Sequence, residues 1–419
     1  MMIADHIPRV SVVIAAYNHA AFVRECIDSV RDQTFSDWEI CVTDDGSSDG
    51  TADILRELAS TDPRIRLNLF AENQGACVAI NDAIARANCE LVALLNSDDR
   101  WLPEKLSRQI AFLDQHPDHA AVFTLPRLID ERGAVFADEN HKDYRVFDVA
   151  NRSRSAWLDH FFRYGNCLCH PSLLIRRSCY TALGTYDPRL AQLPDFDMWV
   201  RLCARHEIHI LTERLVEFRI LDGERNASAA RPEVLAREPW ERLHILRHYL
   251  RRDLAEQVTP MTPPGHPESP DATPPHIRLA WTALAIGTPA HRAFALEILH
   301  HALESGLPPV AGLPDFRDYL RLTGATDVFW QQGMSICHRL QSELEQNRQV
   351  ATVEQTHAQT LLAQQALLHQ QRDALQSALE TAQAQLQELQ TSRSWRLTAP
   401  LRWLARSVWR RLESTYKSS

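Results

Sequence analysis

The sequence predicts an α/β fold with a mostly parallel sheet flanked by helices, followed by an all-α C-terminal region that includes a coiled coil. Two observations support this prediction. Within the first 125 of the 419 residues, short apolar runs alternate with segments that have apolar residues at helical spacing, which is the pattern of repeated strand–helix–strand units. Helical patterns dominate from about residue 231 onward. A chain of this length, with 45% hydrophobic residues, can form two or three compact units.

Four short apolar runs are the predicted strands of the sheet. The first, VSVVIA at 10–15, is a continuous run rich in β-branched residues, as is typical of a parallel strand buried on both faces. The other three strands are predicted at 38–43, 65–70 and 91–95. Apolar residues at helical spacing predict the intervening helices, at 22–30, 51–58 and 76–87.

The pattern loosens beyond residue 125, until an amphipathic helix is predicted at 196–205. The segment 259–275 contains seven of the 22 Pro residues and is predicted to be a linker. The predicted division of the chain is an α/β domain at 1–230, a helical extension at 231–257, a Pro-rich linker at 258–275, a helical region at 276–333, a coiled coil at 334–390 and a basic tail at 391–419.

The coiled-coil prediction rests on a repeat of seven residues. Between residues 331 and 390 there are 16 Gln, one Gly and no Pro. Apolar residues recur at intervals of seven, namely at Leu361, Leu368, Leu375, Ala382 and Leu389. This spacing favours a coiled coil, and hence a homo-oligomer, over a low-complexity coil. A long polar helix packed on its own chain is the remaining alternative.

The tail differs in charge from the rest of the chain. The net charge of −9 combines +6 in the last 29 residues with −15 in the other 390. Trp395, Trp403 and Trp409 are interleaved with Arg in this tail, a composition suited to an anionic lipid surface. We therefore expect a peripheral protein at the inner face of the cell membrane. A solvated basic tail or a docking surface for an acidic partner are the alternatives.

Composition excludes several other classes. The N-terminus lacks the basic start and apolar stretch of a signal peptide, and no apolar run is long enough to span a bilayer. The nine Cys are scattered without a C-x-x-C pair and are expected to be reduced thiols in a cytoplasmic protein. The acidic balance argues against a nucleic-acid partner. With 13 Gly and no G-x-G-x-x-G, any bound nucleotide needs another way to hold its phosphates.

Three polar clusters follow three predicted strands, at 15–18, 44–51 and 96–99. Because parallel strands end at one edge of the sheet, where open α/β folds bind ligands, we expect these clusters to share a cleft. Asp98 and Asp99 are costly to hold side by side unless a cation joins them, and carboxylates suit Mn²⁺ or Mg²⁺. Taken singly, the second cluster could be only a turn with helix caps, and the third only a loop before a helix.

The segments PRVSVVIAAYNHAAFVRECIDSVRDQTFSDWEICVTDDGSSDGT and ENQGACVAINDAIARANCELVALLNSDDRWLPEKL resemble the nucleotide-binding half of the family 2 glycosyltransferases, which have the GT-A fold. The resemblance covers roughly residues 8–225. It implies that Tyr17 and Asp45 contact the base, that Asp98 lies by the ribose and that Asp99 binds the metal. The nucleotide-sugar site it implies consists of Ala15, Tyr17, Asn18, Asp44, Asp45, Asn73 and Asp98.

The segment LPDFDMW at 193–199 resembles the family's E-D-x-D-x-W motif and places Asp195 as the catalytic base. Transfer of a sugar requires a base that takes the proton from the acceptor hydroxyl, and one carboxylate in this role favours single displacement with inversion. A helix N-cap is the alternative for Asp195. Two departures are Pro194, where an acid is usual, and Leu221, where the family's R-x-H-x-x-x-x-S element has His.

Three residues are expected on the acceptor side, namely Trp101, His170 and Asp197. His170 lies in CLCHPS, which resembles the family's H-P-S segment beside the acceptor, with a zinc ligand or plain packing as alternatives. Trp101 is either an acceptor platform or part of the core.

These observations predict a metal-dependent, inverting glycosyltransferase of the hexosyltransferase type. The donor is expected to be a UDP-sugar, and the acceptor a hydroxyl of a cell-surface glycan or a lipid-linked precursor. One alternative is a non-catalytic nucleotide-binding scaffold that organises a glycan-assembly complex through its coiled coil. Another is a nucleotidyltransferase, which would usually have a Gly- and Lys/Arg-rich loop where 15–20 contains no Lys or Arg.

Overall fold

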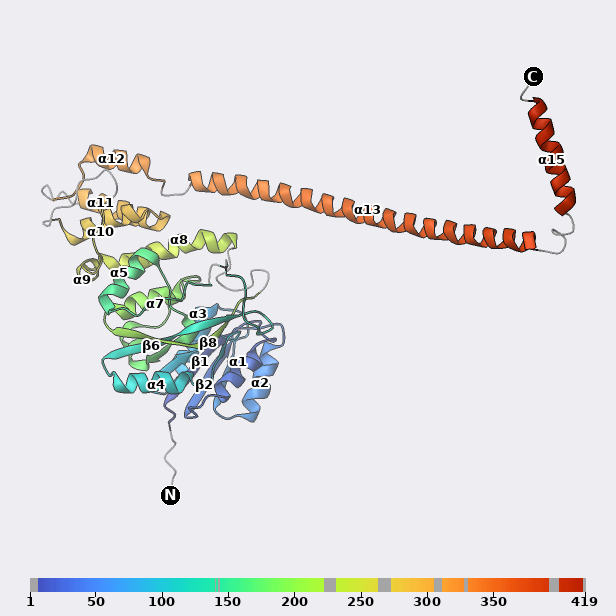
Figure 1. Cartoon of the computed structure of the whole chain (residues 1–419). Helices are drawn as coiled ribbons and strands as arrows, with labels where there is room; N and C mark the ends of the chain where they lie inside the picture. The colour runs from blue at the N-terminus through green and yellow to red at the C-terminus, as the bar shows by residue number, and fades with distance from the viewer. Residues whose placement is uncertain are drawn as a thin grey trace. The chain divides into compact units, whose positions relative to one another are not determined.

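The computed structural model describes residues 7–139, 141, 144–221, 231–262, 273–304, 311–327, 331–391 and 399–416 (Figure 1). The chain divides into two compact units, Met1–Trp330 and Gln331–Ser419. The first unit contains the sheet and its covering helices, and the second is helical where it is described.

One mixed sheet forms the centre of the first unit, with the strand order β3-β2-β1-β4-β7-β6-β8-β5. Its strands are β1 Val10–Ala16, β2 Trp38–Asp44, β3 Ile65–Leu69, β4 Leu91–Leu94, β5 Arg100–Trp101, β6 His119–Ile129, β7 Leu174–Arg176 and β8 Glu207–Arg219. Six strands run in one direction, while β7 and β5 run against it. The prediction of a mostly parallel sheet is therefore confirmed, and β1 to β4 match the four predicted strands to within a residue at each end.

Helices cover both faces of the sheet (Figure 1). On one face lie α1 Val23–Arg31, α2 Thr51–Thr61 and α4 Lys105–Gln115, and on the other α3 Ala76–Arg86, α5 Arg154–Tyr164, α6 Arg177–Leu183 and α7 Pro194–Cys203. Successive strand residues alternate between the two cores: Val12 packs with α1 and α4, whereas Val13 packs with α3 and α7. Burial on both faces explains why these strands are continuous apolar runs.

The helices after β8 are α8 Pro232–Leu246, η3 Arg247–Leu250, α9 Arg252–Ala255, α10 Pro275–Ile286, α11 Pro289–Glu304 and α12 Phe316–Ala325. They do not form a separate core. Ile245 of α8 and Phe294 of α11 belong to the same buried cluster as Trp199 of α7. His291 Nε2 lies 2.7 Å from the Phe162 carbonyl oxygen, which joins α11 to α5. The predicted linker falls largely outside the described residues, which stop at 262 and resume at 273.

The second unit contains two long helices. α13 Gln331–Thr391 is a single helix of 61 residues over the predicted coiled coil, and α15 Ala399–Tyr416 lies in the predicted tail. Leu361, Leu368 and Leu375 of α13 are exposed. Trp395 lies outside the described residues. Within the described ranges, no helix is both long and apolar enough to cross a bilayer.

Candidate active site

A backbone hydrogen bond connects the carboxyl end of β1 to the loop that follows β2. The Asp45 amide donates to the Ala16 carbonyl at 2.8 Å, and the next residue, Gly46, has φ +70°. A Cβ atom on Gly46 would lie 2.5 Å from the Glu72 carbonyl carbon, so only glycine fits this turn. The polar cluster after β2 is thus more than a set of helix caps, since it packs backbone against backbone on the loop at 72–73.

Asn18 connects the β1 loop to the β2 loop. It has φ 53°, a left-handed conformation that Asn tolerates better than most residues. The Asn18 side-chain Oδ1 accepts a hydrogen bond from the Ser48 backbone amide at 2.9 Å. The Asn18 backbone amide donates to Ser47 Oγ at 2.9 Å. The preceding Tyr17 is 45% exposed at the same edge, and Ala15 is half-buried within β1. Tyr17 is therefore open to a ligand.

The two aspartates that end β2 are both buried and differ in their hydrogen bonds. Both oxygens of Asp45 are used, because Oδ1 accepts from the Gln74 amide at 2.7 Å and Oδ2 from the Gly75 amide at 3.0 Å. Asp44 Oδ2 accepts from the Ser47 amide at 3.0 Å, whereas its Oδ1 has no partner among the described residues. Buried oxygens are normally hydrogen-bonded, so Asp44 has the spare acceptor of the pair.

Asn73, the remaining predicted nucleotide-sugar residue, is exposed on the loop that Asp45 and Gly46 fix in place. Its backbone nitrogen would lie 2.7 Å from a Cβ on Gly46. The structure therefore places Asn73 beside the predicted base-binding residues.

Asp98 and Asp99 follow β4 at the same edge of the sheet. Asp99 Oδ2 accepts from Asn96 Nδ2 at 2.9 Å, and Asp98 Oδ2 lies 4.0 Å from His19 Nε2. Burial raises the pKa of both carboxyls, and the neighbouring Asp98 charge raises the pKa of Asp99 further. A cation beside the pair would relieve this repulsion.

Arg219, at the end of β8, is a site residue that the sequence analysis left out of its predicted set. It is 1% exposed, and its amide donates to Asp99 Oδ1 at 2.7 Å. Its guanidinium donates to the Asp98 carbonyl at 2.7 Å, to the Glu131 carbonyl at 2.9 Å and to Glu25 Oε2 at 2.9 Å. Its position as the Arg of the segment that resembles the family's R-x-H-x-x-x-x-S element was the available signal. Leu221 of this element is buried.

The donor set at this edge suits a metal that takes few protein ligands. Among the described residues there is no group of three or more His, Cys, Asp or Glu side chains that could hold a metal ion. Mn²⁺ and Mg²⁺ require only one or two carboxylates when substrate phosphates and water supply the other ligands. Asp98, which is half-buried, and the adjacent buried Asp99 fit this requirement.

Asp195 lies in the first turn of α7, in an environment suited to a base. Its Oδ2 accepts from Asn166 Nδ2 at 2.6 Å, and its Oδ1 accepts from the Phe196 amide at 2.7 Å. Burial raises the pKa of Asp195 to about 6. The N-cap of α7 is Leu193, so the alternative of Asp195 as the helix cap is wrong. Asn166 was not predicted, although it lies just before CLCHPS.

Asp197 has both oxygens engaged within the protein. Oδ1 lies 2.7 Å from His248 Nε2, and Oδ2 accepts from Arg201 Nε at 2.7 Å. Burial pushes its pKa upward, but the bond to His248 and the charge of Arg201 outweigh this and lower the pKa below its usual range. These contacts fix α7 to η3 and assign Asp197 a packing role.

Trp101 and His170 differ in their access to a ligand. Trp101 is buried, its Nε1 donates to the Pro171 carbonyl at 2.9 Å, and Lys105 Nζ lies 3.8 Å from its ring centroid, so the core alternative is the better one. His170 is half-buried, with Nε2 3.1 Å from Tyr186 Oη. Burial lowers the pKa of His170 to about 4, which keeps the ring neutral.

The predicted residues thus form two groups along one edge of the sheet. Tyr17, Asn18, Asp44, Asp98 and others surround the ends of β1, β2 and β4. The second group includes His170 in η1 (His170–Ser172). This turn lies beside the end of β4, because Leu173, which follows it, accepts a hydrogen bond of 3.1 Å from the Leu94 amide.

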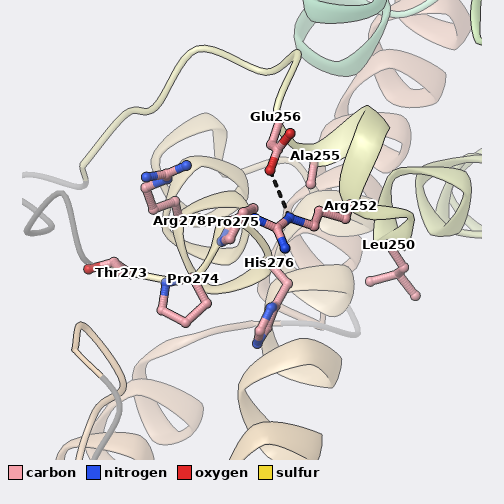
Figure 2. A pocket seen from close by; sticks show the side chains of 9 residues that line it. All are labelled: Leu250, Arg252, Ala255, Glu256, Thr273, Pro274, Pro275, His276 and Arg278. Carbon is pink, nitrogen blue, oxygen red and sulfur yellow. Dashed lines mark hydrogen bonds and ion pairs between the residues drawn. The ribbon is translucent and has the colours of Figure 1, made fainter.

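A hollow lies elsewhere in the first unit. Figure 2 shows this space of about 570 Å³, lined by Leu250, Arg252, Ala255, Glu256, Thr273, Pro274, Pro275, His276 and Arg278. Arg252 Nε and Glu256 Oε1 form an ion pair of 2.9 Å across it. None of the predicted site residues lines this hollow.

Carboxylates at the carboxyl edge of a mostly parallel sheet are typical of α/β proteins that bind nucleotides there. Residues 11–177 match the model of glycosyl transferase family 2. An uncharacterized glycosyltransferase of Nostoc sp. is 30% identical over 232 residues, which cover 53% of this chain and 68% of that protein. The chain belongs to glycosyl transferase family 2.

Two further comparisons are more partial. TuaG of Bacillus subtilis, a glycosyltransferase named for teichuronic acid biosynthesis, is 42% identical to this chain over 106 residues. The matched residues are 25% of this chain and 42% of TuaG. S. aureus TarS 1-349 in complex with UDP-GlcNAc has 18% identity and a TM-score of 0.46, covering 71% of this chain and 87% of that one. The structural likeness is too weak to bear on the site.

Proposed function

We propose that the protein is an inverting, metal-dependent glycosyltransferase that moves a sugar from a nucleotide-sugar, by expectation a UDP-sugar, to an acceptor hydroxyl. The observation that carries the proposal is Asp195, a half-buried carboxylate with a pKa raised to about 6 and held by Asn166. A group of this kind is ionised at neutral pH and basic enough to accept a proton from a hydroxyl. Membership of family 2 supports the same conclusion.

The roles follow from where the residues lie. Tyr17 is exposed and can stack on the base, and Asp44 has a spare buried acceptor for a donor group of the nucleoside. Asp45 positions the loop at 73–75 beside it. His170, held neutral and bonded to Tyr186, lines the acceptor side. Asp195 takes the proton from the acceptor hydroxyl as its oxygen attacks the anomeric carbon, and the diphosphate leaves from the opposite face.

Asp98 and Asp99 would hold a Mn²⁺ or Mg²⁺ ion, which would supply Lewis-acid stabilisation of the leaving diphosphate. Arg219 fixes this pair by bonding one carboxylate and the other residue's carbonyl. The guanidinium of Arg219 bonds the Glu131 carbonyl and the Glu25 carboxylate. We therefore assign the phosphate side of the proposed site to the fixed acids Asp98 and Asp99, and not to Arg219.

The acceptor is proposed to be a cell-surface glycan or its lipid-linked precursor. The similarity to TuaG, which is named for teichuronic acid biosynthesis, supports this class of acceptor. Hydroxyls of a growing glycan are the groups that a base such as Asp195 would activate.

Screening the purified full chain against a panel of UDP-, dTDP- and GDP-sugars tests the proposal. With Mn²⁺ present, one donor should raise the melting temperature and be slowly hydrolysed, and EDTA should abolish both effects. Binding without hydrolysis or transfer would favour the non-catalytic scaffold. No response to any donor would contradict nucleotide-sugar binding altogether.

We further propose that α13 pairs with a second copy of the chain as a coiled coil. Leu368, Leu375 and Leu379 are exposed along one helix, and burying such a stripe against an identical helix removes it from water. Sedimentation velocity of the full chain should give the mass of a dimer or higher assembly. Replacing Leu368 and Leu375 by Asp should return it to the monomer mass, and a monomeric wild type would contradict the pairing.

We propose that α15 binds the anionic inner face of the cell membrane. Leu401, Leu404 and Val408 fall on one face of this helix and are exposed, while Arg402, Arg406 and Arg410 lie on the opposite face. A helix with an apolar face opposite an Arg-rich face is suited to lie in a lipid interface.

Co-sedimentation with vesicles tests this. The wild type should bind vesicles containing phosphatidylglycerol and not neutral ones, and salt should weaken the binding. Replacing Arg406 and Arg410 by Gln should lower the vesicle partition coefficient about 30-fold, at roughly 1 kcal/mol per charge. The matched change of Arg372 and Arg321 to Gln, outside α15, should leave binding unchanged. Equal binding to neutral vesicles would contradict the electrostatic part.

A further inference from the structure

A buried glutamate on α8 holds the loop that leads into Asp195. Glu241 is 1% exposed. Its Oε1 accepts from the Ala191 amide at 2.8 Å, and its Oε2 accepts from the amides of Gln192 and Leu193, each at 2.8 Å. Three consecutive backbone donors therefore converge on one carboxylate, immediately before the turn that carries Asp195.

The local sequence explains why this loop needs an acceptor from elsewhere. α7 begins with Pro194, which has no N–H group, and its N-cap, Leu193, has no side chain that can accept. The amides at 191–193 lie upstream of the helix and do not join its hydrogen-bond ladder. Hydrogen bonds from such amides to a charged carboxylate are the strong ones. Glu241 satisfies all three.

The next residue of α8 touches the other segment that holds the base. Arg242 lies 5.7 Å from the Phe196 ring centroid, and a Cβ on Gly165 would lie 2.5 Å from its Nη1. Gly165 directly precedes Asn166, the donor to Asp195. One turn of α8 thus contacts both the loop before Asp195 and the segment that supplies its hydrogen-bond partner.

α8 is a firm support for these contacts. Ile245 and Leu246 are buried in the cluster that includes Trp199 of α7. η3, which follows α8, adds the bond of 2.7 Å between His248 and Asp197. The residues that fix the start of α7 therefore come from beyond residue 230, outside the segment 11–177 that matches the family.

We propose that Glu241 is a positioning residue for Asp195. Its carboxylate fixes the loop at 191–193 and thereby fixes where Asp195 stands relative to Asn166 and the acceptor hydroxyl. Glu241 touches no substrate and transfers no proton. This inference rests on the proposed function, because it takes Asp195 as the general base.

Three variants of α8 separate positioning from simple loss of packing. Glu241→Gln keeps the size of the side chain but removes the charge and turns a donor toward the loop amides. Glu233→Gln removes a carboxylate that is 57% exposed and paired with Arg231 at 3.3 Å. Ile245→Val removes one buried methylene from the same helix without touching the loop.

Steady-state kinetics should distinguish the variants. Glu241→Gln should lower kcat about 10- to 100-fold and leave the donor KM within about threefold, because a displaced base affects the chemical step and not donor binding. The acid limb of its pH profile should move from about 6 toward about 4 as Asp195 is released to water. Glu241→Asp should recover part of the lost kcat. Glu233→Gln and Ile245→Val should keep the acid limb of the pH profile at the wild-type value of about 6.

Carbon NMR titration of the aspartate-labelled full chain gives a readout that needs no activity. The Asp195 carboxyl signal, assigned by its absence in Asp195→Asn, should titrate near 6 in the wild type and lower in Glu241→Gln. An unchanged pKa in Glu241→Gln would overturn the positioning role, whether or not the protein transfers sugar. A pKa that moves in a protein whose wild type transfers no sugar from any donor would overturn the proposed function alone.

Discussion

Replacing Asp195 by Asn is expected to lower kcat by about 10²- to 10⁴-fold, because an amide cannot accept the proton of the acceptor hydroxyl. The wild-type kcat/KM should rise with pH through about 6, since the base must be ionised to act. Donor affinity, measured by calorimetry, should stay within about threefold of the wild type, because Asp195 serves the acceptor.

Asp187→Asn is the matched control for this variant. Asp187 is in an ion pair with Arg189 at 2.6 Å, eight residues before the base, and its loss should leave kcat unchanged. Full transfer activity in Asp195→Asn would remove Asp195 from the mechanism and leave the catalytic base unassigned.

Asp195→Asn should not destabilise the fold at neutral pH. A carboxyl with a folded pKa of about 6, above the roughly 3.9 of an unfolded Asp, favours the folded state below about pH 4, and this contribution is lost as the pH rises through 6. At pH 7.5 the half-buried charge of Asp195 costs about 3 kcal/mol. Urea unfolding of Asp195→Asn should therefore give a free energy equal to or above that of the wild type at pH 7.5, with a smaller advantage at pH 4.5.

Replacing Arg219 by Met is expected to have the largest effect on stability, a loss of about 3–5 kcal/mol in the free energy of unfolding. The buried guanidinium bonds the Asp98 and Glu131 carbonyls and the Glu25 carboxylate. Met would remove all of these bonds and leave the two carbonyls without this donor. Urea titration measures the loss.

Arg189→Met removes an arginine whose side chain is 87% exposed, and it should change the free energy of unfolding by no more than about 0.5 kcal/mol. Arg219→Lys should fall between the two, because a single ammonium cannot reach all the acceptors that a guanidinium fork reaches. A loss below about 1 kcal/mol in Arg219→Met would show that water replaces the lost bonds.

The first half of the sheet was predictable because its strands are buried on both faces. VSVVIA and LVALL are continuous apolar runs, and their ends are marked by polar clusters. β6 and β8 gave no such signal. β6 contains Pro126 and register shifts against β8, and β8 has three exposed residues at 212–214 in its middle. Each is stabilised by pairing with the other across some 90 residues of chain, which no local pattern records.

The same limit applies to the site. Asp98, Asp99 and Asp195 could be predicted as site residues because each lies in a short, recognisable segment. Their partners are remote: Arg219 bonds Asp99 from 120 residues away, and Asn166 bonds Asp195 from 29. Burial of Trp101 was also beyond the sequence, because an aromatic residue after a strand suits a ligand platform and a core equally well. Spacing reveals which acids are available, and only the fold reveals which donors set their pKa.

The core that α5 and α7 share with α8 and α11 has a consequence for how such proteins diversify. Tyr249 Oη donates to the Leu158 carbonyl at 2.8 Å, so helices far along the chain close the hydrophobic layer on α5 and α7. A domain with its own core can be exchanged as an independent module, but these helices cannot, because their removal would leave that layer uncovered. Substitutions in α8 to α11 can therefore shift α7 from a distance, through the core that they share.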